Sequence, residues 1–252
     1  MRGSPNLAKT SASAQPASHA AGYHGDDRWL LLWAALIGVV GGLATVAFHE
    51  GMAFTESVFT GHPGSLVAAA EALAPWRRSI TPALGGIAAG AFLWWARHVA
   101  HGKKQSDYLE AIVVGDGRQG VRSTLLRTAS SLCTIASGGS IGREGAMVQL
   151  AAATGSWIGQ LARFDGDDLR LLLACGAAAG FASAYDAPLS GAIFIAEIVY
   201  GSLVIRRLGP LMVASVTANV TVHQVLGYEA VYKIRVRDGG AAGSARAGAY
   251  WV

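Results

Sequence analysis

Long apolar stretches with almost no charged side chains set the pattern of the first part of the chain. Residues 29–48 carry no charge, and about 20 apolar residues in a helix cover the roughly 30 Å of hydrocarbon in a bilayer. A second apolar stretch covers residues 80–96, where Pro82 suits the first turn of a helix. Gly86 and Gly90 have the small-xxx-small spacing that lets two helices approach closely. The pattern predicts two membrane-spanning helices, with a core helix of a soluble protein as the alternative for the first.

After Ser106 the apolar stretches become shorter, and Gly, Ser and Pro stand at their junctions. Several stretches are too short to cross a bilayer alone. Broken helices at membrane depth are tolerated where they line a cavity or are buried in protein, and they aim helix N-termini at bound ions. We therefore predict an all-α integral membrane protein with long tilted and short broken helices, the short ones over residues 107–114, 122–136, 146–161, 168–183, 188–200 and 208–226.

The two ends of the chain have a different character. Residues 1–27 are rich in Ser, Ala and His, and residues 235–252 are charged and then rich in Gly and Ala. Such segments cannot bury enough apolar surface to fold. We expect a disordered N-terminal tail, a membrane domain over residues 28–234, and a C-terminal tail that is either disordered or the product of a truncation or a shifted reading frame.

Composition favours a membrane protein and argues against several other classes. Hydrophobic residues make up 52% of the chain and charged residues only 14%, against about 25% charged residues in a soluble domain. The net charge of +4 comes without a basic stripe interleaved with aromatics, which argues against nucleic acid as a partner. The histidines are scattered, so no metal site is expected, and no nucleophile–base pair indicates an enzyme. The basic residues 97–104 favour a cytoplasmic loop.

One segment, residues 137–146, combines glycines with two adjacent charges in apolar surroundings. Arg143 and Glu144 stand side by side there, and a helix-like stretch follows. Glycine-rich backbone before a helix points amide N–H groups and the positive end of the helix dipole at one spot, which suits an anion. A carboxylate can take the place of that anion, and charges at membrane depth indicate function.

Two further acidic residues follow in apolar sequence. Asp186 precedes Pro188 and is either a plain helix N-cap or a functional group. Glu197 lies within an apolar stretch, where it either pairs with an Arg or with backbone groups, or lines an ion path.

Three motifs, in a fixed order, give the sequence a family resemblance. They are Gly142-Arg143-Glu144-Gly145 followed by Val148-Gln149, the glycine pair Gly176 and Gly180, and Ala187-Pro188-Leu189-Ser190-Gly191 leading to Glu197. Together they resemble the CLC family of voltage-gated chloride channels and chloride–proton antiporters, and its bacterial chloride channel type B branch in particular, over residues 29–234. The resemblance implies the first half of the family's inverted-repeat fold, a multi-pass protein of the inner membrane, and a homodimer at full length.

The resemblance also implies roles for single residues. It implies that Glu144 is the gating glutamate, whose carboxylate occupies an anion site and moves away or becomes protonated to admit chloride. The anion site would be formed by the surrounding loop and by the one serine that remains of an earlier family motif: Gly142, Arg143, Gly145, Ala146 and Ser106. No cofactor is implied, since chloride is the transported ligand.

Three positions depart from the family pattern. Ala146 stands where a Pro is usual, which loosens the helix start, and an acidic Asp107 beside the remaining serine is unexpected. Ile198 stands where the antiporters have a glutamate that relays protons, and an aliphatic side chain carries no proton. We expect chloride permeation through a CLC-type pore gated by Glu144, with opening that depends on pH and with voltage dependence left open. A chloride–proton antiporter and a truncated membrane fragment that transports nothing are the alternatives.

Overall fold

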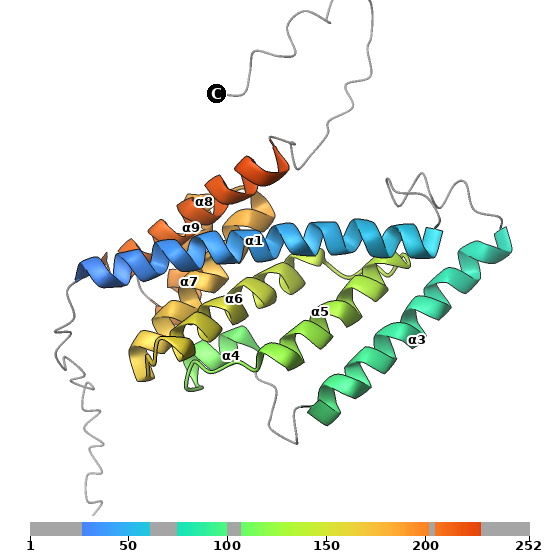
Figure 1. Ribbon diagram of the computed structural model, residues 1–252, viewed down its shortest axis with the longest axis horizontal. Helices are drawn as coiled ribbons and strands as arrows, with labels where there is room; N and C mark the ends of the chain where they lie inside the picture. Colours follow the sequence, from blue (N-terminus) through green and yellow to red (C-terminus); the bar gives the residue numbers. More distant parts are fainter. Residues whose placement is uncertain (1–26, 61–74, 100–106, 202–204, 228–252) are drawn as a thin grey trace, which may run out of the picture.

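The computed structural model describes residues 27–60, 75–99, 107–201 and 205–227. Every regular element in these four ranges is a helix (Figure 1): α1 (Asp27–Thr60), α3 (Pro75–Val99), α4 (Tyr108–Val113), α5 (Val121–Ala136), α6 (Arg143–Leu161), α7 (Gly166–Tyr185), α8 (Pro188–Tyr200) and α9 (Ile205–Leu226). The all-α prediction is confirmed, and each of the helices expected in these ranges is present. The two predicted tails lie outside the described residues, except for Asp27, which begins α1.

α1 is the longest helix and lies across much of the molecule (Figure 1). Its 34 residues make it about 51 Å long at 1.5 Å per residue, well beyond the roughly 30 Å of a bilayer core. It packs along α9 and also contacts α5, α6 and α7. By length and composition, Arg28–Phe59 in α1 is the one described helix apolar enough to cross a membrane. The second predicted span, in α3, does not meet the same criteria of length, hydropathy and charge content.

The core lies where α6 and α7 pack against each other almost backbone to backbone. α7 is buried along most of its length. A methyl group added to Gly176 would stand 2.5 Å from the carbonyl oxygen of Ala151, and one added to Gly180 would stand 2.8 Å from the Cα of Val148. Only glycine fits at such distances, so Gly176 and Gly180 form a face on which α6 and α7 pack closely.

α3 begins earlier than the apolar pattern indicates. Its first residue is Pro75, so Pro82 lies inside the helix and not in its first turn. Proline suits the first position of a helix because its missing N–H has no intrahelical acceptor there. The polar residues between Pro75 and the apolar stretch continue the helix, and Pro82 then removes one backbone hydrogen bond from it.

α3 also packs through a different face from the predicted one. Gly86 and Gly90 are exposed, and a methyl group added to either would meet no described atom within 4 Å. Gly85 and Ala89 are buried instead, and the Ala89 carbonyl accepts a hydrogen bond from Ser130 Oγ of α5 at 2.9 Å. The contact with α5 therefore uses two small residues at the predicted four-residue spacing, but the pair lies one residue earlier in the chain, at Gly85 and Ala89.

The turn between α7 and α8 excludes one of the two alternatives for Asp186, that it is the N-cap of the following helix. Asp186 ends α7 in the left-handed conformation (φ 53°, ψ 40°), and the N-cap of α8 is Ala187, which makes no side-chain cap bond. The Asp186 carboxylate Oδ1 lies 2.7 Å from Nε2 of His223 in α9. Asp tolerates the left-handed conformation better than most residues, and the partner in α9 takes the carboxylate away from the start of α8.

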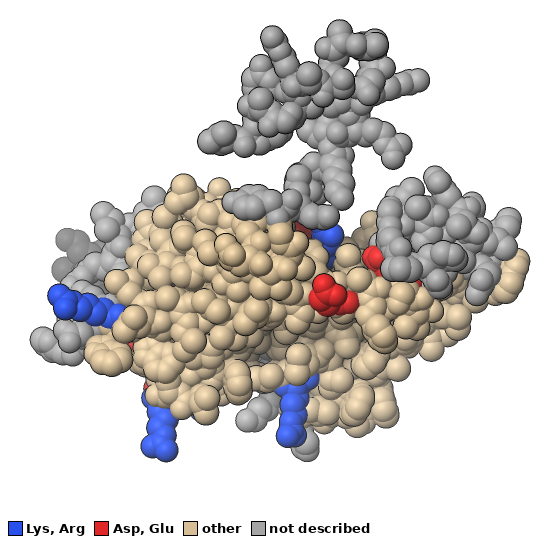
Figure 2. Space-filling model, turned by 45° about the horizontal axis from the view of Figure 1, so that its top comes forward, with Lys and Arg blue, Asp and Glu red and all other residues tan. Residues whose placement is uncertain are grey.

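Charged side chains are sparse on the face shown in Figure 2, where a few of them stand within a broad uncharged surface. Large apolar side chains are exposed on several helices, among them Trp29, Ile87 and Trp94. A monomeric soluble protein rarely exposes a large continuous apolar patch. The surface therefore fits contact with lipid or with further protein.

Candidate anion-binding site

The first turn of α6 contains most of the residues predicted to bind an anion. The helix begins at Arg143, with Gly142 as an N-cap in an extended conformation (φ −61°, ψ 134°) that makes no side-chain cap bond. The predicted start at Ala146 is therefore wrong, because Arg143, Glu144, Gly145 and Ala146 already form the first turn. The first four N–H groups of a helix have no acceptor inside it, so this turn offers the donors that the prediction assigned to a loop.

The Glu144 carboxylate lies over the start of its own helix. A methyl group added to Gly142 would stand 2.6 Å from Glu144 Oε2 and 3.8 Å from the carboxyl carbon. The side chain is partly buried. A negative group at this position is stabilised by the positive end of the helix dipole, typically by about 0.3–1 kcal/mol and by up to about 2 kcal/mol where it is partly buried.

Replacing Gly142 by Ala should displace the Glu144 carboxylate without disturbing the backbone. The φ of −61° suits any residue, so the added methyl group acts only on the carboxylate in front of it. We expect the ¹³C resonance of the Glu144 carboxyl carbon to move in the Gly142→Ala protein in detergent, with a loss of at most about 1 kcal/mol in the free energy of unfolding. Gly90→Ala, at an exposed helical position, should leave the resonance in place. An unmoved resonance in both variants would contradict the placement of the carboxylate.

Arg143 lies near charged groups of α1. It lies close enough to Glu56 and His49 of α1 to act electrostatically on both, and Glu56 is buried, with a relative exposure of 8%. Among the ion pairs of the described residues, none joins Arg143 to its sequence neighbour Glu144. The two adjacent charges therefore have different surroundings. Arg143 acts on His49 and Glu56 of α1, whereas the Glu144 carboxylate lies at the N-terminus of α6.

Ser106 lies outside the described residues, but the start of the helix that follows it is well defined. Asp107 is the N-cap of α4, and its Oδ1 accepts a hydrogen bond from the Tyr108 N–H at 2.8 Å. The same N–H also donates to Oε1 of Gln149 in α6 at 3.1 Å. The unexpected acidic residue is thus accounted for as a helix cap, and the end of α4 next to Ser106 lies against α6.

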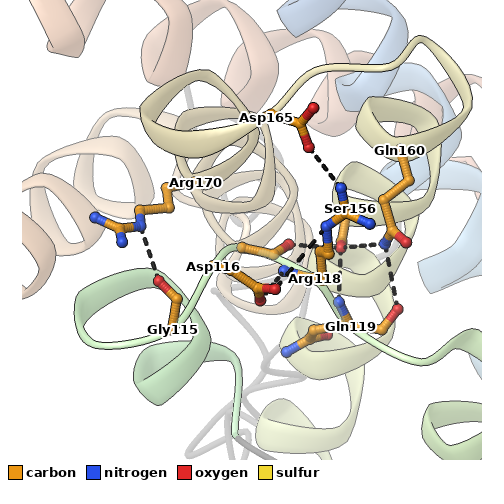
Figure 3. A network of polar contacts seen from close by, with 9 residues as sticks. Gly115, Asp116, Arg118, Gln119, Ser156, Gln160, Asp165 and Arg170 are labelled. Atoms are coloured by element: carbon orange, nitrogen blue, oxygen red, sulfur yellow. Dashed lines mark hydrogen bonds and ion pairs between the residues drawn. The ribbon is translucent and has the colours of Figure 1, made fainter.

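A buried polar network, which the sequence analysis did not identify, holds the loop between α4 and α5 on α6 (Figure 3). Ser156 is fully buried; its Oγ accepts from the Gln119 N–H at 2.8 Å and donates to the Gly117 carbonyl at 2.7 Å. Gln160 Nε2 donates to the same Oγ at 2.9 Å. Arg170 of α7 adds a bond from Nε to the Gly115 carbonyl at 2.9 Å. In the sequence, the central residue of this network shows only as a serine, Ser156, within an apolar helix.

Glu197 is exposed on α8, and so is its neighbour Ile198. α8 packs on α4, α7 and α9 through its other face, which includes Ile195 and Ala196. Within the described ranges no Lys or Arg lies within ion-pair distance of Glu197. None of the ion pairs of the described residues joins Glu197 to the first turn of α6, and an ion-path role stays a prediction. In the same ranges no three His, Cys, Asp or Glu side chains are grouped so that they could hold a metal ion.

The described residues form an all-helical fold with a candidate anion site at a helix N-terminus. The chain belongs to the voltage gated chloride channel family, the CLC family, whose sequence profile matches residues 85–251. The resemblance inferred from the three sequence motifs is therefore confirmed.

Similar proteins come from several bacteria. A ClcB-like protein of Ralstonia nicotianae is 49% identical over 207 residues, which are 81% of this chain and 48% of that protein. The voltage-gated ClC-type chloride channel ClcB of Yersinia pestis is 45% identical over 210 residues, 81% of this chain and 50% of that one. The crystal structure of a slow cyanobacterial Cl⁻/H⁺ antiporter matches with a TM-score of 0.64 at 20% identity, over 81% of this chain and 48% of the other. The chain thus spans about half the length of the curated relatives it matches, and it shares the helical fold of the CLC antiporter.

Proposed function

We propose that this protein conducts chloride across a membrane and that Glu144 gates the path. The position of the Glu144 carboxylate over the first turn of α6, with Oε2 2.6 Å from where a Gly142 Cβ would be, carries this proposal. A carboxylate and a halide ion compete for the same N–H groups and the same positive helix end. Membership of the voltage gated chloride channel family supports chloride as the ion.

Opening requires the carboxylate to leave the first turn of α6 or to lose its charge. The backbone of Gly142, Arg143, Gly145 and Ala146 then becomes available to chloride, and Ser106 is proposed as a further ligand from the segment before α4. A protonated carboxyl group is a weaker competitor for these donors than a carboxylate. Acidification should therefore favour the open state.

We propose uncoupled permeation in preference to proton exchange, because the residue after Glu197 is aliphatic Ile198. Among the described residues, none of the ion pairs includes Glu197, and the aliphatic Ile198 carries no proton. Chloride–proton exchange is the second candidate, because the matched crystal structure is of a Cl⁻/H⁺ antiporter. The two differ in whether protons move with chloride.

A reversal-potential measurement separates the two candidates. With the protein in liposomes under a fixed chloride gradient, we expect the potential at zero current to follow chloride alone and to stay unchanged when a pH gradient is added. Proton exchange would move this potential with the pH gradient. Such a shift would overturn uncoupled permeation and leave chloride transport in place, whereas a lack of any chloride flux would overturn the proposed function itself.

The proposed surroundings follow from the same observations. The broad uncharged surface (Figure 2) supports a lipid bilayer as the environment, and the bacterial relatives support the inner membrane. For the full-length protein we propose a homodimer. These are proposals because the chain spans only about half of its relatives.

A further inference from the structure

Gln149 connects the helix of the proposed chloride site, α6, with the start of α4. Its Oε1 accepts the Tyr108 N–H of α4 at 3.1 Å, and its Nε2 donates to Oε1 of Gln119 at 3.2 Å. Gln119 is in turn fixed by the bond from its N–H to buried Ser156 (Figure 3). Gln149 lies five residues after Glu144, which is about 7.5 Å along the axis of the same helix. One side chain thus joins the start of α4, the loop before α5 and the helix that carries Glu144.

The direction of each amide in this chain of bonds is fixed. The Tyr108 N–H is a donor only, so Gln149 must present its carbonyl to α4 and its NH₂ group to Gln119. Gln119 must then present its own carbonyl, and its Nε2 is left buried without a partner among the described residues. A buried unpaired donor is costly. Stability of the fold alone therefore gives no reason for this arrangement, because an apolar pair would avoid that cost.

The Tyr108 N–H and the side-chain amides of Gln149 and Gln119 are all uncharged. Amide side chains can hold two helices together at membrane depth without the cost of a buried charge, and they add no fixed charge to a path for anions. The Tyr108 N–H also donates to Asp107 Oδ1. The backbone at the start of α4 is therefore held by one contact within its own segment and by one contact from α6.

We propose that Gln149 is a positioning residue for chloride permeation. Its carbonyl holds the first amide of α4 on α6, and this contact sets the spacing between the Asp107 end of α4 and the Glu144 turn of α6. The inference rests on the proposed function, because the spacing matters only if chloride passes between these two ends. Loss of the contact lets the end of α4 move and lowers the affinity for chloride. The barrier to chloride flux that Glu144 sets remains.

Gln149→Met tests this role, with Gln160→Met as the matched control. Both substitutions replace a glutamine of α6 that belongs to the same network, but only Gln149 reaches α4; Gln160 bonds to Ser156 and Gln119. In liposomes, we expect Gln149→Met to raise the chloride concentration for half-maximal flux about fivefold, in keeping with one lost neutral hydrogen bond. The maximal flux should stay within about twofold. Gln160→Met should leave both quantities within about twofold.

Hydrogen exchange of the Tyr108 amide supplies a second, structural measurement. It should become faster in Gln149→Met and in the milder Gln149→Asn, whose side chain is one methylene shorter, and stay unchanged in Gln160→Met. Equal changes in half-saturating chloride for Gln149→Met and Gln160→Met would overturn the positioning role, and so would faster exchange with unchanged chloride dependence. If the parent protein conducts chloride and Gln149→Met changes neither the chloride dependence nor the amide exchange, this inference alone is refuted. If the parent conducts no chloride, the proposed function and this inference are refuted together.

Discussion

Chloride flux through the Glu144→Ala protein is expected to exceed that of the parent at neutral pH and to stop responding to pH. The carboxylate over the first turn of α6 is the proposed competitor of chloride, and a charge in that position gains up to about 2 kcal/mol from the helix. Its removal should therefore raise flux by up to about 30-fold. Parent flux should rise on acidification, because a protonated carboxyl group competes less well for the N–H donors. Glu144→Ala, and Glu144→Gln as a mimic of the protonated form, should give flat profiles in liposome assays.

Asp168→Asn is the matched control for this experiment. It removes a carboxylate from the first turn of another helix, α7, and it has no place in the proposed path. Its flux and pH profile should match those of the parent. If Glu144→Ala keeps the parent's flux and pH profile, the gate has been assigned to the wrong residue.

Gly176→Ala is expected to destabilise the protein strongly. The added methyl group would stand 2.5 Å from the Ala151 carbonyl oxygen and 3.0 Å from the Cα of Ala152, both backbone atoms that cannot turn away. α6 and α7 must separate to admit it, and overpacking of this kind typically costs about 1–3 kcal/mol. We expect the unfolding midpoint in detergent to fall by roughly 2–12 °C.

The same glycine-to-alanine change at Gly90 provides the comparison. That position is exposed and has no described neighbour within 4 Å, so Gly90→Ala should be neutral or should stabilise α3 by up to about 1 kcal/mol through its better helix propensity. Equal midpoints for Gly176→Ala and Gly90→Ala would contradict the backbone-to-backbone packing of α6 on α7. Because α6 carries Glu144, Gly176→Ala should also lower chloride flux.

Prediction from the sequence was most successful where the signal is local. Apolar stretches and the Gly and Pro residues between them predicted each described helix, because helix formation and helix termination depend on residues within a few positions of each other. Helix starts were less well predicted. α3 starts at Pro75 and α6 at Arg143, each ahead of its apolar stretch, because polar residues continue a helix as readily as apolar ones once it is anchored elsewhere by packing.

The sequence by itself determined the family, the all-helical class and the presence of a carboxylate at a glycine-rich helix start. Tertiary structure alone decided which groups this carboxylate and its neighbours meet. Asp186 bonds to His223, 37 residues away, and Gln149 bonds to Tyr108, 41 residues away. Periodicity reports which residues share a face of one helix, but it does not report which helix that face meets. The partners of Asp186, Arg143 and Gln149 depend on how the helices are arranged, and that arrangement is set by close packing such as the glycine contact between α6 and α7.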